Sequence, residues 1–146
     1  MSNKDVFEME RRKYDLKYPA EELIRFLAKN SQKMEGNKIL DFGCGSGRNS
    51  KMLLECGYDV YAMDYADTCL ELSREKCGEK VHYIKNHALD RPLEAGIMDC
   101  IVAWGALFLC KKLEEETLFG NLVKTLKPGG LLIADYRSKE ELVDKV

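Results

Sequence analysis

Two acidic residues and a glycine-rich turn form the part of the chain that could hold a charged ligand. Asp41 closes a short apolar run, and Gly43, Gly45 and Gly47 follow it at alternate positions. A strand, a glycine turn and a helix in this order bring backbone N–H groups against a ligand, although such a turn can also simply let a strand meet a helix. A dinucleotide-binding turn would place its third glycine where Arg48 stands, and the Asp41 carboxylate would repel a pyrophosphate. The same carboxylate would attract an ammonium or sulfonium group.

A second acid follows at the distance expected for a ribose-binding residue. The alternating pattern of residues 58–63 predicts a strand, and Asp64 ends it 17 positions after Gly47. A carboxylate at this strand end can accept hydrogen bonds from both ribose hydroxyls. Alternatively, Asp64 caps the helix predicted over residues 67–76. Asp67 is better placed as that cap, which would leave Asp64 for the ligand.

The glycine pattern resembles motif I of the class I S-adenosylmethionine-dependent methyltransferases, and the resemblance extends from Pro19 to Tyr136. Residues 81–84 resemble the third strand of that fold, residues 98–104 the fourth, opening with Asp99, and residues 126–130 the turn into a fifth strand at 131–135. The resemblance implies an α/β fold with a doubly wound, mainly parallel sheet of strand order 3-2-1-4-5. It also implies S-adenosyl-L-methionine as cofactor, with S-adenosyl-L-homocysteine as product. The cofactor-binding residues that it implies are Asp41, Gly43, Cys44, Gly45, Gly47, Asp64, Tyr65, His87, Ala88 and Trp104.

One position departs from the family pattern. After the third strand these enzymes usually carry an acid that accepts from the adenine amino group, but this chain has His87 followed by Ala88. A neutral imidazole can accept one such bond, whereas a protonated one cannot. Asp90 could take the role instead, and His87 could also be an ordinary histidine of a surface loop.

The reaction implied by the family is methyl transfer from a sulfonium group. The enzyme has to hold an acceptor in line with the methyl group and exclude water, so no catalytic residue is assigned. Trp104 and Gly105 are where the methyl group and the acceptor would meet. Residues 103–106 lack the motifs for methylation of nucleobases or amides, which leaves a small-molecule acceptor of unspecified nucleophilic atom. Two alternatives remain: a cofactor-binding module without turnover, and a Rossmann oxidoreductase, which Asp41 and the glycine spacing disfavour.

Composition narrows the class of protein further. The 146 residues carry a net charge of −2, so no basic surface argues for a nucleic-acid partner. The chain has neither a span of about 20 apolar residues nor a signal peptide, so we expect no membrane partner and a cytoplasmic location. Its six cysteines include no C-x-x-C pair. We therefore expect reduced thiols and no metal site.

The remaining segments predict a single domain over residues 1–146. Helices are expected at residues 5–14, 19–29 and 114–126. In the second of these, Pro19 suits the first turn and an apolar stripe follows, formed by Leu23, Ile24 and Leu27. That helix would cover the cofactor pocket, with Tyr14 or Tyr18 as a lid residue.

The family normally adds a C-terminal antiparallel hairpin, for which this chain has no sequence. Either the chain is a fragment or it is a naturally short version, and we expect a fragment. The strand at residues 131–135 would then leave an open apolar edge, through which two copies could pair as a homodimer.

Overall fold

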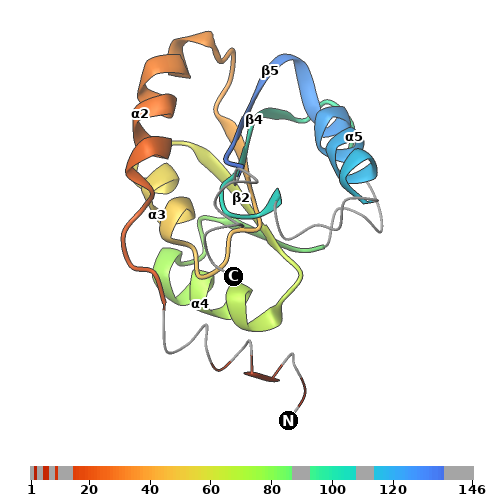
Figure 1. Cartoon of the computed structure of the whole chain (residues 1–146). Coiled ribbons are helices and arrows are strands. Elements are labelled where there is room, and N and C mark those ends of the chain that lie inside the picture. The colour runs from red at the N-terminus through yellow and green to blue at the C-terminus, as the bar shows by residue number, and fades with distance from the viewer. Residues whose placement is uncertain are drawn as a thin grey trace, which may run out of the picture.

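A five-stranded parallel sheet forms the centre of the computed structural model, which describes residues 2, 5, 6, 9, 15–86, 93–107 and 114–136. Its strand order is β3-β2-β1-β4-β5, and every pair of neighbours is parallel (Figure 1). The strands are β1 (Lys38–Phe42), β2 (Asp59–Asp64), β3 (His82–Lys85), β4 (Met98–Ala103) and β5 (Leu126–Ala134). The predicted fold class and strand order are therefore confirmed.

Helices cover both faces of this sheet. They are α2 (Glu21–Asn30), which continues into a 3₁₀ turn (Ser31–Lys33), α3 (Arg48–Glu55), α4 (Asp67–Cys77) and α5 (Glu115–Thr125). Figure 1 shows α2, α3 and α4 on one side of the sheet and α5 on the other. Since successive side chains of a strand point to opposite faces, Ile39 joins the core beneath α2 and α3, and Leu40 joins the core beneath α5.

The helix after Pro19 begins later than predicted. Ala20 is still extended, so α2 starts at Glu21 and Pro19 lies outside it. Leu23 and Leu27 of the predicted stripe are buried against the sheet, whereas Ile24 is 39% exposed. The helix therefore packs through a narrower stripe than the sequence indicated.

The glycine-rich segment at residues 126–130 is part of β5 and not a turn before it, so this prediction was wrong. Met98 pairs with Leu126, but Cys100 pairs with Leu131, so β5 carries extra residues between two consecutive pairings. Gly129 has a φ of 78° at this irregularity, a conformation that a residue with a side chain rarely adopts. The strand then runs in register with β4 as far as Ala134.

β5 lies at one end of the sheet, and its apolar residues from Leu131 to Ala134 are only half-buried. Pairing of two chains through this edge stays a prediction. Within the described part of the chain, no helix is long and apolar enough to cross a membrane. The described cysteines are all free thiols, and the described residues hold no group of three or more potential metal ligands.

Candidate functional site

The loop between β1 and α3 packs closely against the segment after β4 and against α4. Gly43, Gly45 and Gly47 all have positive φ values, of 68°, 56° and 90°. A Cβ atom on Gly43 would come within 2.7 Å of the Ala106 Cβ, and one on Gly47 would come within 3.0 Å of the Ser73 Cα. The loop therefore needs glycine for its backbone shape and, at Gly43 and Gly47, for the close approach of its neighbours.

A cavity of about 310 Å³ opens beside this loop, at the carboxyl ends of the strands. Its volume is at the lower end of the usual range for small-molecule sites. In parallel α/β sheets, ligands bind at this edge. Its lining residues are Leu16, Gly43, Cys44, Gly45, Ser46, Arg48, Asn49, Trp104, Gly105 and Asp135.

Four residues predicted to contact the cofactor line this cavity: Gly43, Cys44, Gly45 and Trp104. Gly105, where we placed the meeting of methyl group and acceptor, also lines it. A Cβ atom added to Gly105 would meet nothing within 4 Å, so its backbone borders open space. The cavity thus joins the glycine loop to the segment after β4, as the sequence predicted.

Asp64 lies behind the loop and is 8% exposed. Its Oδ2 accepts a hydrogen bond from the Gly45 N–H and its Oδ1 accepts one from the Ala66 N–H, both at 3.0 Å. The carboxylate therefore fixes the loop to the start of α4. Each oxygen retains a second lone pair that could accept from a ligand hydroxyl.

The prediction that Asp67 caps α4 was wrong. Ala66 is the capping residue, and Asp67 is the first residue of the helix. Asp67 forms an ion pair with Lys85 at 2.9 Å. The sequence pattern predicted the start of the helix to within one residue. The side chain that accepts a hydrogen bond from the backbone there, from the Ala66 N–H, is that of Asp64.

Asp41 is buried beneath the loop and accepts a hydrogen bond of 2.6 Å from the Ser50 hydroxyl. Burial raises the pKa of Asp41 to about 6, and the nearby Asp64 carboxylate acts in the same direction, while the Ser50 bond opposes it. Two acids therefore lie close together at the carboxyl ends of β1 and β2. A ligand with positive charge would relieve their repulsion.

Cys44 occupies the loop as an unreactive thiol. Burial raises the pKa of Cys44 well above its ordinary value, and the Asp41 and Asp64 carboxylates add to the effect. A thiol that stays protonated is a poor nucleophile. The position of Cys44 in the tight loop therefore requires a small side chain and no cysteine chemistry.

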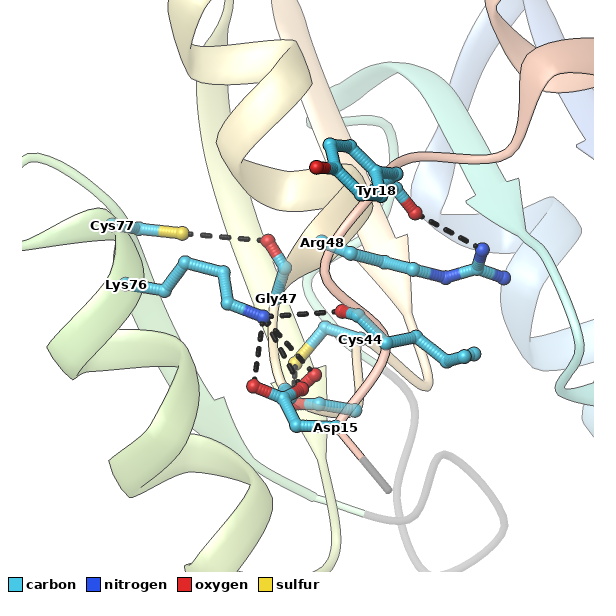
Figure 2. Close-up of polar contacts among 10 residues, drawn as sticks. Asp15, Tyr18, Cys44, Gly47, Arg48, Lys76 and Cys77 are labelled. Carbon is cyan, nitrogen blue, oxygen red and sulfur yellow. Dashed lines mark hydrogen bonds and ion pairs between the residues drawn. The ribbon is translucent and has the colours of Figure 1, made fainter. Parts of the chain in front are cut away.

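A strap of residues 15–20 contributes Leu16 to the cavity lining and is held by Lys76 of α4 (Figure 2). The Lys76 ammonium lies 3.2 Å from both carboxylate oxygens of Asp15 and donates to the Leu16 carbonyl at 3.2 Å and the Ser46 hydroxyl at 3.4 Å. Since Leu16 and Ser46 both line the cavity, this one side chain ties the strap to the glycine loop.

The first residues of α3 hold the other end of the strap. Arg48 donates to the Tyr18 carbonyl at 3.2 Å, and Asn49 accepts from the Ala20 N–H at 3.0 Å. Figure 2 shows the Arg48 side chain extended toward this carbonyl. The Tyr18 side chain is 75% exposed, so the strap is held here through its backbone.

Several lining residues had no predicted role in cofactor binding: Leu16, Ser46, Arg48, Asn49 and Asp135. Ser46, Arg48 and Asn49 adjoin the glycine pattern, so proximity to it would have been a sufficient signal. Asp135 follows β5, and its Oδ1 accepts from the Gly105 N–H at 2.6 Å. Its place at a strand end was visible in the sequence, but its contact with Gly105 was not.

The other predicted residues that the structure describes are not among those lining the cavity. Asp41, Asp64 and Gly47 support the loop from behind, and Tyr65 is 55% exposed beside Asp64. The predictions for His87, Ala88, Asp90 and Tyr14 fall outside the described residues, as does most of the helix expected at residues 5–14.

Comparison with known proteins decides between the families considered. The sequence model of the methyltransferase domain family matches residues 39–130, from β1 into β5. This chain belongs to the methyltransferase domain family. The match includes the glycine loop, Asp64 and the segment after β4, which are the parts that form and support the cavity.

Individual proteins agree with this assignment. An uncharacterized methyltransferase of Geobacillus sp. (strain WCH70) is 31% identical over 98 residues, which are 67% of this chain and 46% of that protein. The crystal structure of the PH0226 protein from Pyrococcus horikoshii superposes with a TM-score of 0.74 at 21% identity, covering 94% of this chain and 69% of the other. A TehB-like S-adenosylmethionine-dependent methyltransferase from Corynebacterium glutamicum gives a TM-score of 0.67 at 18% identity, with 84% and 76% covered.

The fold is that of the class I methyltransferases, and one neighbour of this fold, the glycopeptide N-methyltransferase MtfA, has been solved in complex with S-adenosylmethionine. The geometry fits that molecule, because buried carboxylates lie behind a glycine loop that opens on a cavity of suitable size. The chain spans less than half of the Geobacillus relative.

Proposed function

We propose that this chain binds S-adenosylmethionine at the glycine loop and serves in methyl transfer to a small-molecule acceptor. The observation that carries the proposal is the pair of buried acids, Asp41 and Asp64, behind a loop that lines an open cavity. A nucleotide with phosphate groups would be repelled there, whereas a sulfonium would be attracted.

Each group has a distinct role in this proposal. Asp64 accepts from the ribose hydroxyls through its remaining lone pairs while its present bonds keep the loop in place, which requires the cofactor to extend from the cavity past the glycine loop to the end of β2. Asp41 acts at longer range, because its charge lies under the loop and not in the cavity wall. Arg48 supplies a positive charge to the wall, suited to the cofactor's carboxylate. The adenine contact predicted for His87 stays a prediction.

When bound, the cofactor supplies an electrophilic methyl group. The chain's contribution is to orient both reactants and to keep water from the cavity. Trp104 provides an apolar wall next to the open backbone of Gly105, and the strap held by Lys76 adds Leu16 to the lining. No general base is needed for this role.

A small acceptor agrees with the size of the cavity and with the names of several relatives. These include a demethylmenaquinone methyltransferase and a glycine N-methyltransferase, whereas another relative, a malonyl-[acyl-carrier protein] O-methyltransferase, is named for an acceptor attached to a carrier protein. Their acceptors differ in nucleophilic atom, so the family alone selects no chemistry for this chain.

Calorimetry with S-adenosylhomocysteine tests the proposal. Asp64→Ala removes a buried charged acceptor, and we expect it to weaken binding by about 2–4 kcal/mol. Asp67→Ala is the matched control, since it removes an acid three positions away that pairs with Lys85 on the surface. Wild-type affinity in Asp64→Ala, or equal losses in the two variants, would contradict the assignment. Binding of NAD in place of S-adenosylhomocysteine would contradict the cofactor site itself.

A further inference from the structure

One carboxylate in the cavity wall has no part in the cofactor contacts proposed above. Asp135 directly follows β5 and lines the cavity together with Trp104 and Gly105. Its Oδ1 is fixed by the Gly105 N–H at 2.6 Å. Within residues 15–86, 93–107 and 114–136, its Oδ2 has no hydrogen-bond partner, so one acceptor oxygen is available at the cavity.

Among the described residues, no cation forms an ion pair with Asp135. Arg48 lines the same cavity, yet the described residues include no ion pair between the two side chains. By contrast, Asp99 at the opposite edge of the sheet is paired with Lys127 at 3.0 Å. A half-buried carboxylate whose only described partner is a neutral amide favours a cationic group from a ligand.

The strand order places Asp135 on the side of the cavity away from the proposed ribose contact. Asp64 ends β2, the glycine loop follows β1, Gly105 follows β4 and Asp135 follows β5. In the sheet these strands lie in the sequence β2-β1-β4-β5. A cofactor whose ribose lies at Asp64 therefore has Asp135 beyond its far end, where the acceptor would enter.

We propose that Asp135 is a specificity residue for an acceptor that carries an amine nitrogen, an inference that rests on the proposed function. A neutral amine attacks the methyl carbon with its lone pair, and the bond from that carbon to sulfur breaks with its electrons on sulfur. Nitrogen gains the positive charge that sulfur loses, so the products are a methylammonium and a neutral thioether. The fixed Asp135 carboxylate stabilises the charge that develops on nitrogen. The extra proton leaves nitrogen to water after release.

Sinefungin is a suitable probe, because it carries an amine-bearing carbon in place of the methyl-bearing sulfur. Calorimetry compares its affinity with that of S-adenosylhomocysteine for the 146-residue chain and for Asp135→Asn. The asparagine can still accept from the Gly105 N–H, but it lacks the charge. We expect sinefungin to bind Asp135→Asn about tenfold or more weakly, the loss of one charge-assisted hydrogen bond, with S-adenosylhomocysteine unchanged.

Two further variants separate this role from a structural one. Asp135→Glu retains the charge and is expected to retain the preference for sinefungin, whereas Asp59→Asn changes the net charge equally at the start of β2 and should have no effect. An unchanged ratio of the two affinities in Asp135→Asn would overturn the inference, and so would an equal loss for both ligands. Failure of wild type to bind S-adenosylhomocysteine would instead overturn the proposed function.

Discussion

Buried aspartates at the two ends of the parallel strands differ in how their charge is balanced. We call the amino ends of the strands the amino edge of the sheet and the carboxyl ends its carboxyl edge. At the amino edge, Asp99 is the second residue of β4 and accepts from the Lys38 N–H and the Lys127 ammonium, both at 3.0 Å. Burial would raise its pKa, but these partners together bring the pKa of Asp99 below its ordinary value. At the carboxyl edge, Asp41 is the last but one residue of β1, its hydrogen-bond partner is a neutral hydroxyl, and burial raises its pKa to about 6.

The difference separates a structural acid from one suited to a ligand. The Lys127 ammonium balances the charge of Asp99, so the ionised form of Asp99 stabilises the fold. Asp41 receives none in its hydrogen bond and lies near a second acid, Asp64, so its ionisation costs stability. A buried carboxylate whose ionised form lowers the stability of the fold is typical of a functional site.

The largest effect is expected at the amino edge. Asp99→Ala would leave the Lys38 N–H without its acceptor in a buried place, and we expect a loss of about 2–4 kcal/mol in the free energy of unfolding. Urea denaturation at pH 7 measures it. Because the folded-state pKa of Asp99 is lowered, its stabilisation is present above pH ~4 and is lost at lower pH. An unfolding free energy within 0.5 kcal/mol of wild type, the usual range for surface changes, would remove the distinction between the edges.

Asp41→Asn should raise the free energy of unfolding, whereas Asp99→Ala should lower it. The shift of its pKa from 3.8 to about 6 corresponds to about 3 kcal/mol, which the ionised form costs at pH 8. In the wild type this destabilisation disappears as pH falls through 6, because Asp41 of the folded state then binds a proton. We expect the variant to be more stable than wild type by about 1–3 kcal/mol at pH 8 and equal to it near pH 4. Urea titrations at both values check this, and a destabilised variant at pH 8 would show that the carboxylate is needed for folding.

The smallest effect is expected at the strap. Lys76→Met keeps the length of the side chain but loses the contacts with Asp15, Leu16 and Ser46. The Lys76 side chain is 15% exposed and the Asp15 side chain 32%, so we expect stability to change by less than about 1 kcal/mol. Dissociation of S-adenosylhomocysteine, followed by stopped flow, should become several times faster. Lys76→Arg should restore most of the slow rate; wild-type kinetics in Lys76→Met would show that the strap does not retain the ligand.

The sequence predicted the carboxyl edge better than the rest of the molecule, because the residues that form it lie close together in the sequence. The glycine spacing and the positions of Asp41 and Asp64 are set within one β-α-β unit, so periodicity and family resemblance locate them. Leu16 and Asp135 also line the cavity, but they reach it only through the path of the strap and the sheet order, which local patterns do not show. The family resemblance predicts a turn at residues 126–130, but pairing of Leu126 with Met98 of β4 makes them part of β5.

The central claim is that the acids of the carboxyl edge select a cationic cofactor. Calorimetric affinities of S-adenosylmethionine and S-adenosylhomocysteine, which differ by the sulfonium charge, test it most directly in wild type and Asp41→Asn at pH 8. We expect the variant to lose about 1 kcal/mol, roughly fivefold, of its relative preference for S-adenosylmethionine. Asp67→Asn, the control, should lose none. The wild-type preference should also fall as pH drops from 8 to 5 and Asp41 takes up a proton, while that of the variant stays constant. Equal preferences in wild type and Asp41→Asn at pH 8 would contradict the account.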